Sequence, residues 1–163
     1  MARTEEAEAF FHAVYTAVQE IPFGKVTTYG HIARLVGTPE RPRQVGICLK
    51  HLPTDPASRF NNENVPWQRV INAKGTISPR YIHLTSHPYN PFSHRHTRAH
   101  IHIHVHTHLT SNPHLSSQPS GARNQAEALQ AEDVEVSRTA MGEFQVDFSS
   151  YGWFPDVLPS EEE

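Results

Sequence analysis

The feature that most constrains the fold is the short stretch Val65-Pro66-Trp67-Gln68-Arg69-Val70. Pro66 lacks the N–H that a strand interior requires, so it belongs at a strand start. The stretch ends in β-branched residues, which suit a pleated surface. A turn with glycine at a strained position follows at Ala73-Lys74-Gly75-Thr76. The pattern predicts a short strand that presents Trp67 where the chain enters it; the alternative is an ordinary core aromatic.

The length of the chain predicts one domain with an appended segment. A domain of this size can fold without stabilising cross-links. The 163 residues include one cysteine, Cys48, which excludes an internal disulfide framework and a multi-cysteine zinc site. No stretch approaches the roughly 18 apolar residues of a membrane helix, and the acidic start has no signal-peptide pattern. We therefore expect a soluble intracellular protein, nuclear or cytoplasmic, with no targeting signal and no membrane partner.

The charge is spread unevenly along the chain. The formal net charge is −3, yet residues 1–80 carry ten Lys/Arg against seven Asp/Glu, whereas residues 121–163 carry two against ten. The first half is therefore mildly basic, and nucleic-acid binding stays open despite the negative total. The terminal run Glu161-Glu162-Glu163 is expected to be a solvated tail.

The first predicted helix has apolar residues at i, i+3, i+4 and i+7 between Phe11 and Val18. This spacing predicts an amphipathic scaffold helix of about three turns. Thr4 is the expected N-cap, and Ile21-Pro22-Phe23-Gly24 is expected to stop the helix and turn the chain.

Two further helices are predicted in quick succession. Thr27 or Thr28 caps the first of them, which stops at Gly37, and Pro42 suits the first position of the next. In that third helix one face is expected to be buried (Val45, Cys48, Leu49 and Leu52) and the other to point outward (Arg43, Gln44, Ile47 and Lys50).

This helix pair fits helix-turn-helix geometry, because a short turn leads into a helix with a cationic outer face. Gly46 has no side chain, so another group can approach that helix closely. Arg43 and Lys50 would equally suit an ordinary surface, so the pattern alone is a weak signal for DNA binding. Cys48 faces inward in this register, which predicts a buried and inert thiol.

Residues 81–120 contain ten of the thirteen histidines, five of them alternating from His100 to His108. As a strand this run would align five imidazoles, which are good ligands for zinc, copper or nickel. The favoured interpretation is a low-complexity insert without a fixed fold, because it has little to bury. A third hypothesis is retained non-coding sequence, since residues 78–80 read smoothly into residues 121–123.

Beyond the insert, Ser120 is expected to cap a fourth helix that runs to Gln130. Apolar and polar residues alternate at 134–136 and 144–148, with Met141-Gly142 between them, and this pattern predicts a hairpin. Tyr151, Trp153 and Phe154 are expected to form a closing aromatic cluster. The predicted division is a domain of residues 5–80 and 121–155, the insert 81–120, and an acidic tail 156–163.

Four motifs lie in an order and spacing that resemble one family: Ile21-Pro22-Phe23-Gly24-Lys25-Val26-Thr27-Thr28-Tyr29-Gly30, Ile32-Ala33, Arg43-Gln44-Val45-Gly46 and Val65-Pro66-Trp67-Gln68-Arg69-Val70-Ile71-Asn72. Over residues 10–80 and 121–150 the chain resembles the DNA-binding domain of O6-alkylguanine-DNA alkyltransferases. More narrowly, it is similar to the alkyltransferase-like proteins, in which tryptophan replaces the reactive cysteine of the Pro-Cys-His-Arg motif. The resemblance implies a mainly α (α+β) fold, a winged-helix-like helix-turn-helix domain with small β elements, interrupted by the insert.

The resemblance also implies roles for single residues. Tyr29, after Thr28, matches the tyrosine that rotates a phosphate so that a nucleotide leaves the duplex. Arg43 matches the finger that fills the gap, and Trp67 and Arg80 match groups that line the lesion pocket and sense the altered base. The residues expected to contact DNA are Thr28, Tyr29, Pro42, Arg43, Gln44, Gly46 and Lys50, and those of the pocket are Val65, Pro66, Trp67 and Arg80.

Departures from the alkyltransferase pattern point away from catalysis. Trp67 has no nucleophilic sulfur, Gln68 replaces the histidine that activates the thiolate, and His51 stands where asparagine is usual. No catalytic residue, metal or cofactor is therefore expected.

The resulting expectation is a monomeric, non-enzymatic damage sensor. It would bind duplex DNA that carries O6-alkylguanine, flip that base into a Trp-lined pocket and flag it for nucleotide excision repair proteins. One alternative is a residual alkyltransferase that uses Cys48 as its acceptor. The other is a metal-binding protein built around the His-rich insert.

Overall fold

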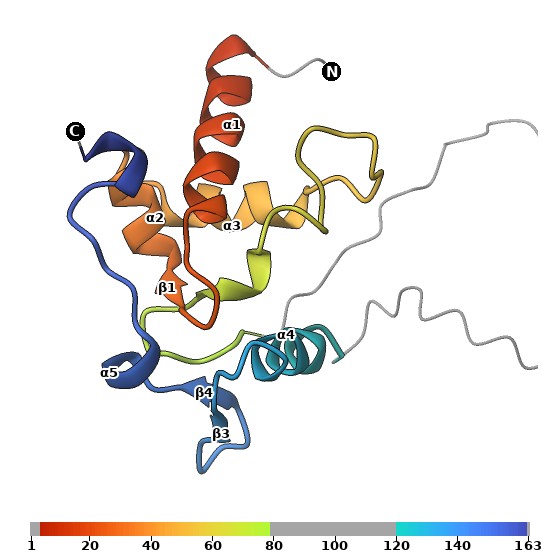
Figure 1. Cartoon of the computed structure of the whole chain (residues 1–163), viewed down its shortest axis with the longest axis vertical. Coiled ribbons are helices and arrows are strands. Elements are labelled where there is room, and N and C mark those ends of the chain that lie inside the picture. The colour runs from red at the N-terminus through yellow and green to blue at the C-terminus, as the bar shows by residue number, and fades with distance from the viewer. Residues whose placement is uncertain (1–3, 79–119, 163) are drawn as a thin grey trace, which may run out of the picture.

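The structure is a computed structural model that describes residues 4–78 and 120–162 (Figure 1). Short helices and two-stranded β elements alternate along it. Their order is α1 (Glu5–Gln19), β1 (Thr27–Thr28), α2 (Tyr29–Leu35), α3 (Pro42–Lys50), the 3-10 helix η1 (Trp67–Arg69), β2 (Val70–Ile71), α4 (Ser120–Gln130), β3 (Val136–Arg138), β4 (Phe144–Val146), α5 (Phe148–Tyr151) and the 3-10 helix η2 (Pro159–Glu161). The expectation of a mainly helical fold with small β elements is confirmed.

The N-terminal helices begin and end where the local sequence predicts. The Thr4 side chain accepts a hydrogen bond from the Ala7 amide, and the acidic residues of the first turn favour the positive end of the helix dipole. The Thr28 hydroxyl accepts from the His31 amide at 3.0 Å, which settles the choice between two threonine caps. Pro42 is the first residue of α3, as expected. Two bounds differ: α1 is longer than expected, at 15 residues, and α3 ends at Lys50, so Leu52 lies beyond the helix and is only partly buried.

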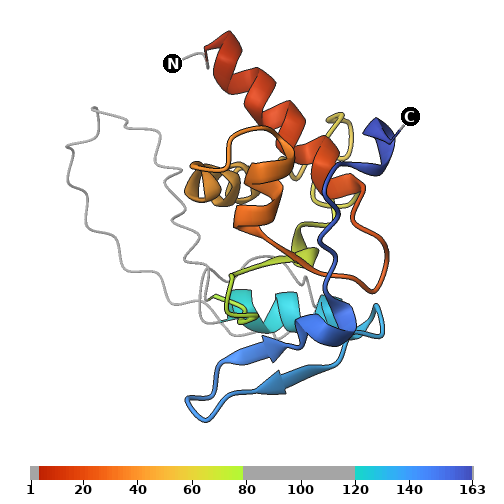
Figure 2. The ribbon, with the colours of Figure 1, turned by 90° about the vertical axis from the view of Figure 1, so that its left-hand side faces the viewer.

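Two hydrophobic cores lie at opposite ends of the molecule, one beneath α1, α2 and α3 and the other against α4 and the hairpin (Figure 2). The helical core consists of Val14, Tyr15, Ala17, Val18, Ile21, Ile32, Ala33, Val45, Cys48, Leu49, Val65, Val70 and Leu158. The hairpin core consists of Val26, Ile71, Ile77, Ala122, Ala126, Leu129, Val134 and Val146.

Strand β2 forms the junction between these cores. Val70 belongs to the helical core and Ile71 to the hairpin core, because successive residues of a strand point to opposite faces. β2 pairs in parallel with β1, with Thr27 opposite Val70 and Thr28 opposite Ile71. The start of α2 is thereby held beside the segment that follows Trp67.

The expected strand around Trp67 is wrong in extent. Only Val70–Ile71 is extended, and Trp67–Arg69 forms a 3-10 turn with Pro66 as its N-cap. The Trp67 amide bonds to the Val65 carbonyl at 2.7 Å, so local hydrogen bonds replace a ladder. The turn predicted at residues 73–76 is confirmed, with Gly75 at φ +75°.

The second half contains the predicted helix and hairpin with altered bounds. β3 begins two residues later than expected, and β4 ends at Val146 because Asp147 caps α5 by accepting from the Ser149 amide. The expected aromatic cluster is divided between the cores. Trp153 packs against the helical core and Tyr151 against the hairpin core, whereas Phe154 is 46% exposed.

The segment 156–162, expected to be a solvated tail, is exposed except at Leu158, which packs in the helical core. Leu158 is only 6% exposed, and η2 lies beside α1, where the chain ends its run back from α5 (Figures 1 and 2). The tail was predicted from its acidic residues, and that prediction took no account of Leu158. Burial of this one apolar side chain decides where the segment lies. Glu161 and Glu162 are exposed, as expected.

Several expectations lie outside the described residues. They are the insert 81–120 with its proposed metal-binding histidines, its absence of a fixed fold, and Arg80. Within residues 4–78 and 120–162, no group of three or more His, Cys, Asp or Glu side chains is placed to hold a metal ion. No helix in that part of the chain is long and apolar enough to cross a membrane.

Candidate nucleic-acid interface

The outward face of α3 carries the residues expected to contact DNA. Pro42, Arg43, Gln44 and Lys50 are exposed, and the helix contains no acidic residue. Within the described part of the chain, no ion pair involves Arg43 or Lys50. The opposite face buries Val45, Cys48 and Leu49, so the amphipathic register predicted for this helix is confirmed.

Tyr29 connects α2 to this face. It is the first residue of α2 and is half-buried against the helical core. A Cβ built on Gly46 would lie 3.8 Å from the Tyr29 ring, so this ring is the group that approaches α3 at the glycine. A methyl group would fit there in ordinary contact, but a longer side chain would displace the ring. Thr28, Tyr29 and Gly46 are therefore brought together with the α3 face.

His31 lies two residues after Tyr29, on the side of α2 that meets the C-terminal segment. Its ring packs edge-on against Phe154, with the ring centroids 5.2 Å apart. Burial lowers the pKa of His31, with Arg34 acting in the same direction, and hydrogen bonding to Pro155 and the charge of Asp156 oppose that effect.

Trp67 was expected to be either a side chain presented by a short strand or an ordinary core aromatic, and its position has features of both. It packs against the helical core, yet the residue as a whole is only half-buried, so it is not a fully enclosed core aromatic. Val65 is fully buried and Pro66 half-buried, and together they anchor the turn that carries the indole. Two large hollows, of about 320 Å³ and 450 Å³, are lined by other residues. A lesion pocket at Trp67 therefore stays a prediction.

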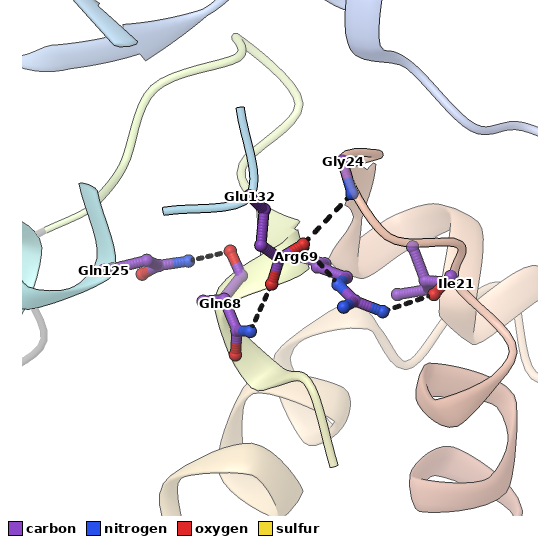
Figure 3. A network of polar contacts seen from close by, with 6 residues as sticks. All are labelled: Ile21, Gly24, Gln68, Arg69, Gln125 and Glu132. Carbon is purple, nitrogen blue, oxygen red and sulfur yellow. Dashed lines mark hydrogen bonds and ion pairs between the residues drawn. The ribbon is translucent and has the colours of Figure 1, made fainter. Parts of the chain in front are cut away.

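A buried carboxylate fixes the turn that carries Trp67 (Figure 3). Glu132, which follows α4, accepts from the Gln68 amide nitrogen at 2.6 Å and from Arg69 Nε at 2.7 Å. It also accepts from the Gly24 backbone amide at 3.1 Å. Arg69 donates from its Nη1 to the Ile21 carbonyl at 2.7 Å. We call these residues the Glu132 network.

The Glu132 network joins three segments that are distant in sequence. It ties the turn before β1 and the turn of Trp67 to the end of α4, at the junction of the two cores. Gly24 has φ +71°, and a Cβ there would lie 3.1 Å from the Glu132 carbonyl oxygen, so this close approach favours glycine. The network thereby sets the position of Trp67 relative to the start of α2.

Gln125 completes the support of this turn from α4. Its side-chain nitrogen donates to the Gln68 carbonyl at 2.9 Å and to the Val70 carbonyl at 3.0 Å, and the residue is 1% exposed. A two-residue strand leaves backbone groups without ladder partners, and a buried carbonyl without a partner is costly. Gln125 supplies a side-chain donor to one carbonyl of the Trp67 turn and one of β2.

Sequence reasoning missed both Gln125 and Glu132, which it took only as part of the fourth helix and its end. A signal was present, because both residues fall on the stripe of Ala122 and Leu129 at helical spacing. Polar residues on an apolar stripe indicate a buried polar contact.

Two other residues singled out from the sequence, His51 and Cys48, make structural contacts. His51 ends α3, and its Nδ1 lies 2.9 Å from the Ile47 carbonyl. Cys48 is fully buried in the helical core, as expected. This burial makes it a poor acceptor for an alkyl group on DNA.

Comparison with known proteins identifies relatives of this chain. Residues 9–87 match the family described as 6-O-methylguanine DNA methyltransferase, DNA binding domain. The alkyltransferase-like protein 1 of Schizosaccharomyces pombe is 35% identical over 148 residues, covering 91% of this chain and 97% of that protein. The DNA base-flipping protein of Escherichia coli is 43% identical over 76 residues, which are 47% of this chain and 54% of that protein.

A solved structure of the S. pombe protein is similar as well. That crystal structure is of a complex with damaged DNA containing O6-carboxymethylguanine. It aligns with a TM-score of 0.59 at 35% identity, covering 94% of this chain and all of the other.

Proposed function

The chain belongs to the alkyltransferase-like proteins of the O6-alkylguanine-DNA alkyltransferase family, and from this premise we propose that it recognises O6-alkylguanine in duplex DNA by base flipping, without repairing it. The observation that carries the proposal is the position of Trp67. It is partly buried on a turn held by the Glu132 network, beside the start of α2. The complex of the S. pombe relative with damaged DNA containing O6-carboxymethylguanine supports the choice of ligand.

In this proposal α3 enters the minor groove with its outward face. Arg43 and Lys50 are exposed cations that would meet phosphates and the gap in the base stack, with Pro42, Gln44 and Gly46 along the same face. Tyr29, with Thr28 before it, would turn the nucleotide out of the duplex. A damaged base requires less energy to leave the stack, which adds selectivity.

The flipped base would lie in a pocket built from Val65, Pro66 and Trp67, with Arg80 reading its edge. An indole face and a cation recognise a base by stacking and cation–π attraction. Apolar contacts to the alkyl group would favour O6-alkylguanine over guanine. We place this pocket in the domain of residues 5–80 and 121–155, with a winged-helix-like arrangement.

Absence of alkyl transfer follows from the residues at the site. Trp67 offers no thiolate. The Gln68 amide is already hydrogen-bonded to Glu132 and has no basic nitrogen with which to accept a proton from a nucleophile. The bound complex would therefore persist and flag the lesion for nucleotide excision repair proteins, with the protein acting as a monomer.

A binding titration tests this proposal. One duplex with and without a single O6-methylguanine is titrated at two salt concentrations, against wild type and Trp67→Ala. We expect a lesion preference that Trp67→Ala reduces by about tenfold, because stacking a base on an aromatic side chain contributes ~1–3 kcal/mol. Equal affinities that fall together with salt would indicate phosphate contacts alone and refute the proposal.

Trp153→Ala is the matched control for this titration. Trp153 is also half-buried against the helical core, but it lies outside the proposed pocket. The substitution should lower stability and leave the lesion preference unchanged. Equal loss of preference in both variants would mean that Trp67 acts only through the core.

A further inference from the structure

The C-terminal segment is held to α1 by one serine and one carboxylate. The Ser160 hydroxyl donates to Glu20 Oε1 at 2.6 Å, and the Ser160 amide donates to Glu20 Oε2 at 3.0 Å. Leu158 is the only buried side chain between residues 156 and 162. Glu20 therefore supplies the specific polar contact, and Leu158 the apolar one.

Ser160 is also accessible, and acidic residues follow it in the sequence. The residue is exposed, in a 3-10 turn of only three residues. Short 3-10 turns with few buried contacts open locally at low cost. Glu161, Glu162 and Glu163 follow directly. Three carboxylates that follow an exposed serine in the sequence match the charge of a basic substrate groove.

We propose that Ser160 is a phosphorylation site for an acid-directed protein kinase, and that its phosphorylation releases the C-terminal segment from α1. The reaction transfers the γ-phosphoryl group of a nucleoside triphosphate. A bond forms between the Ser160 oxygen and the phosphorus, and the bond to the β–γ bridging oxygen breaks. The nucleoside diphosphate leaves, and the hydroxyl proton passes to the catalytic base of the kinase.

Release follows from the chemistry of the contact. The hydroxyl is a donor to Glu20, whereas a phosphate offers acceptor oxygens and about −2 charges at neutral pH. The hollow beside the contact is lined by two acids, Glu20 and Glu161, and by His12, whose ring lies edge-on against Phe60. The phosphate would therefore face mainly like charge. The apolar contact of Leu158 and the exposed Arg34–Asp156 pair would then have to hold the segment.

The first experiment asks whether the full chain is modified at Ser160. Wild type is incubated with a serine/threonine kinase that requires acidic residues C-terminal to its target, with Mg-ATP, and the phosphate is mapped by mass spectrometry. We expect phosphate at Ser160, and its loss in Ser160→Ala and in a variant with all three following glutamates changed to glutamine.

Thr4 is an internal comparison, because Glu5, Glu6 and Glu8 follow it but lie within α1, where Thr4 is the N-cap. Phosphate on Thr4 with none on Ser160 would overturn the proposal. No phosphate on Ser160, while a control peptide is modified in the same tube, would overturn it equally.

The second experiment tests release by reversing one charge. Hydrogen exchange of the peptide covering residues 156–163 is compared before and after phosphorylation, in wild type and in Glu20→Lys. Phosphorylation should speed exchange in wild type. In Glu20→Lys it should slow exchange, because the phosphate gains a cation. Faster exchange in both proteins, or no change in either, would contradict release by repulsion from Glu20.

Discussion

Two arginine–carboxylate pairs of nearly equal length lie in very different surroundings in this molecule. Arg69 and Glu132 are 2.7 Å apart, with side chains 14% and 7% exposed. Arg34 and Asp156 are 2.8 Å apart, with side chains 55% and 96% exposed. The first pair includes Arg69 of the Trp67 turn, near the junction of the two cores, and the second ties the C-terminal segment to α2.

The difference between these pairs shows that distance alone does not measure an interaction. Water and salt screen the exposed pair, so its net contribution is small. The buried pair loses hydration, but further hydrogen bonds from Gln68 and Gly24 satisfy the carboxylate. Removing one member there leaves a buried charge without a partner. The proposed site is therefore organised by the interaction that is costliest to break.

The largest effect is expected for Glu132→Ala. It leaves Arg69, Gln68 and the Gly24 amide without their acceptor, and breaking a buried ion pair costs about 3–5 kcal/mol. Denaturant unfolding measures the loss, and a duplex titration should show a weakened lesion preference, because the Trp67 turn is no longer fixed.

The double variant Arg69→Met/Glu132→Leu is the control for that loss. Apolar replacement of both partners restores most of the stability lost on removing one, in buried pairs of this kind. Stability near wild type combined with a lost lesion preference would show that the network serves positioning. A double variant as unstable as Glu132→Ala would contradict the account of an unpaired charge.

A smaller effect is expected for Gln125→Leu. The substitution keeps the volume but removes the side-chain donor that Gln125 supplies to the Gln68 and Val70 carbonyls, at a cost of about 1–3 kcal/mol. Gln130→Leu is the matched control on the same helix. Gln130 is exposed, so thermal unfolding should show a change within about 0.5 kcal/mol. Equal changes would mean that the buried carbonyls find other partners.

The region around the exposed Arg34–Asp156 pair should respond to pH through the partly buried His31. The pKa of His31 in the folded protein is lowered from 6.5, mainly by burial. At a pH between the lowered pKa and 6.5, the unfolded chain therefore binds more protons than the folded one. Stability should therefore fall as the pH drops below about 6.5. Urea unfolding across pH 5 to 8 measures this (about the range where histidine titrates). His31→Gln should flatten the profile, and an unchanged slope would assign it to other groups.

The smallest effect is expected for Arg34→Ala. An exposed ion pair contributes about 0–1 kcal/mol, and salt reduces it. Denaturation at low and high salt should show a difference from wild type that shrinks as salt rises. A loss as large as that of Glu132→Ala would remove the contrast between the two pairs.

The local parts of the fold were predictable from a few neighbouring residues. The caps at Thr4 and Thr28, the start of α3 at Pro42 and the turn at Gly75 all appear as expected. Each depends on one side chain or one backbone conformation acting within three or four residues. The buried face of α3 likewise follows from helical spacing.

The parts that failed depend on partners that are distant in sequence. The turn at Trp67 was expected to be a strand, but β2 has only the two-residue partner β1 across 43 positions of the chain. Leu158 was assigned to a solvated tail because nothing near it in sequence shows the core that receives it. Trp67 as a candidate site residue came from the motif resemblance, not from periodicity.

The sequence by itself determined the family, helices α1 to α4, the caps of α1 and α2, and the outward cationic face of α3. Only the tertiary structure decided that Glu132 and Gln125 support the Trp67 turn and that Ser160 meets Glu20. The physical reason is that propensity and capping act over one helical turn. A buried charge or carbonyl is instead satisfied by whichever segment the packing of the two cores brings within hydrogen-bond distance.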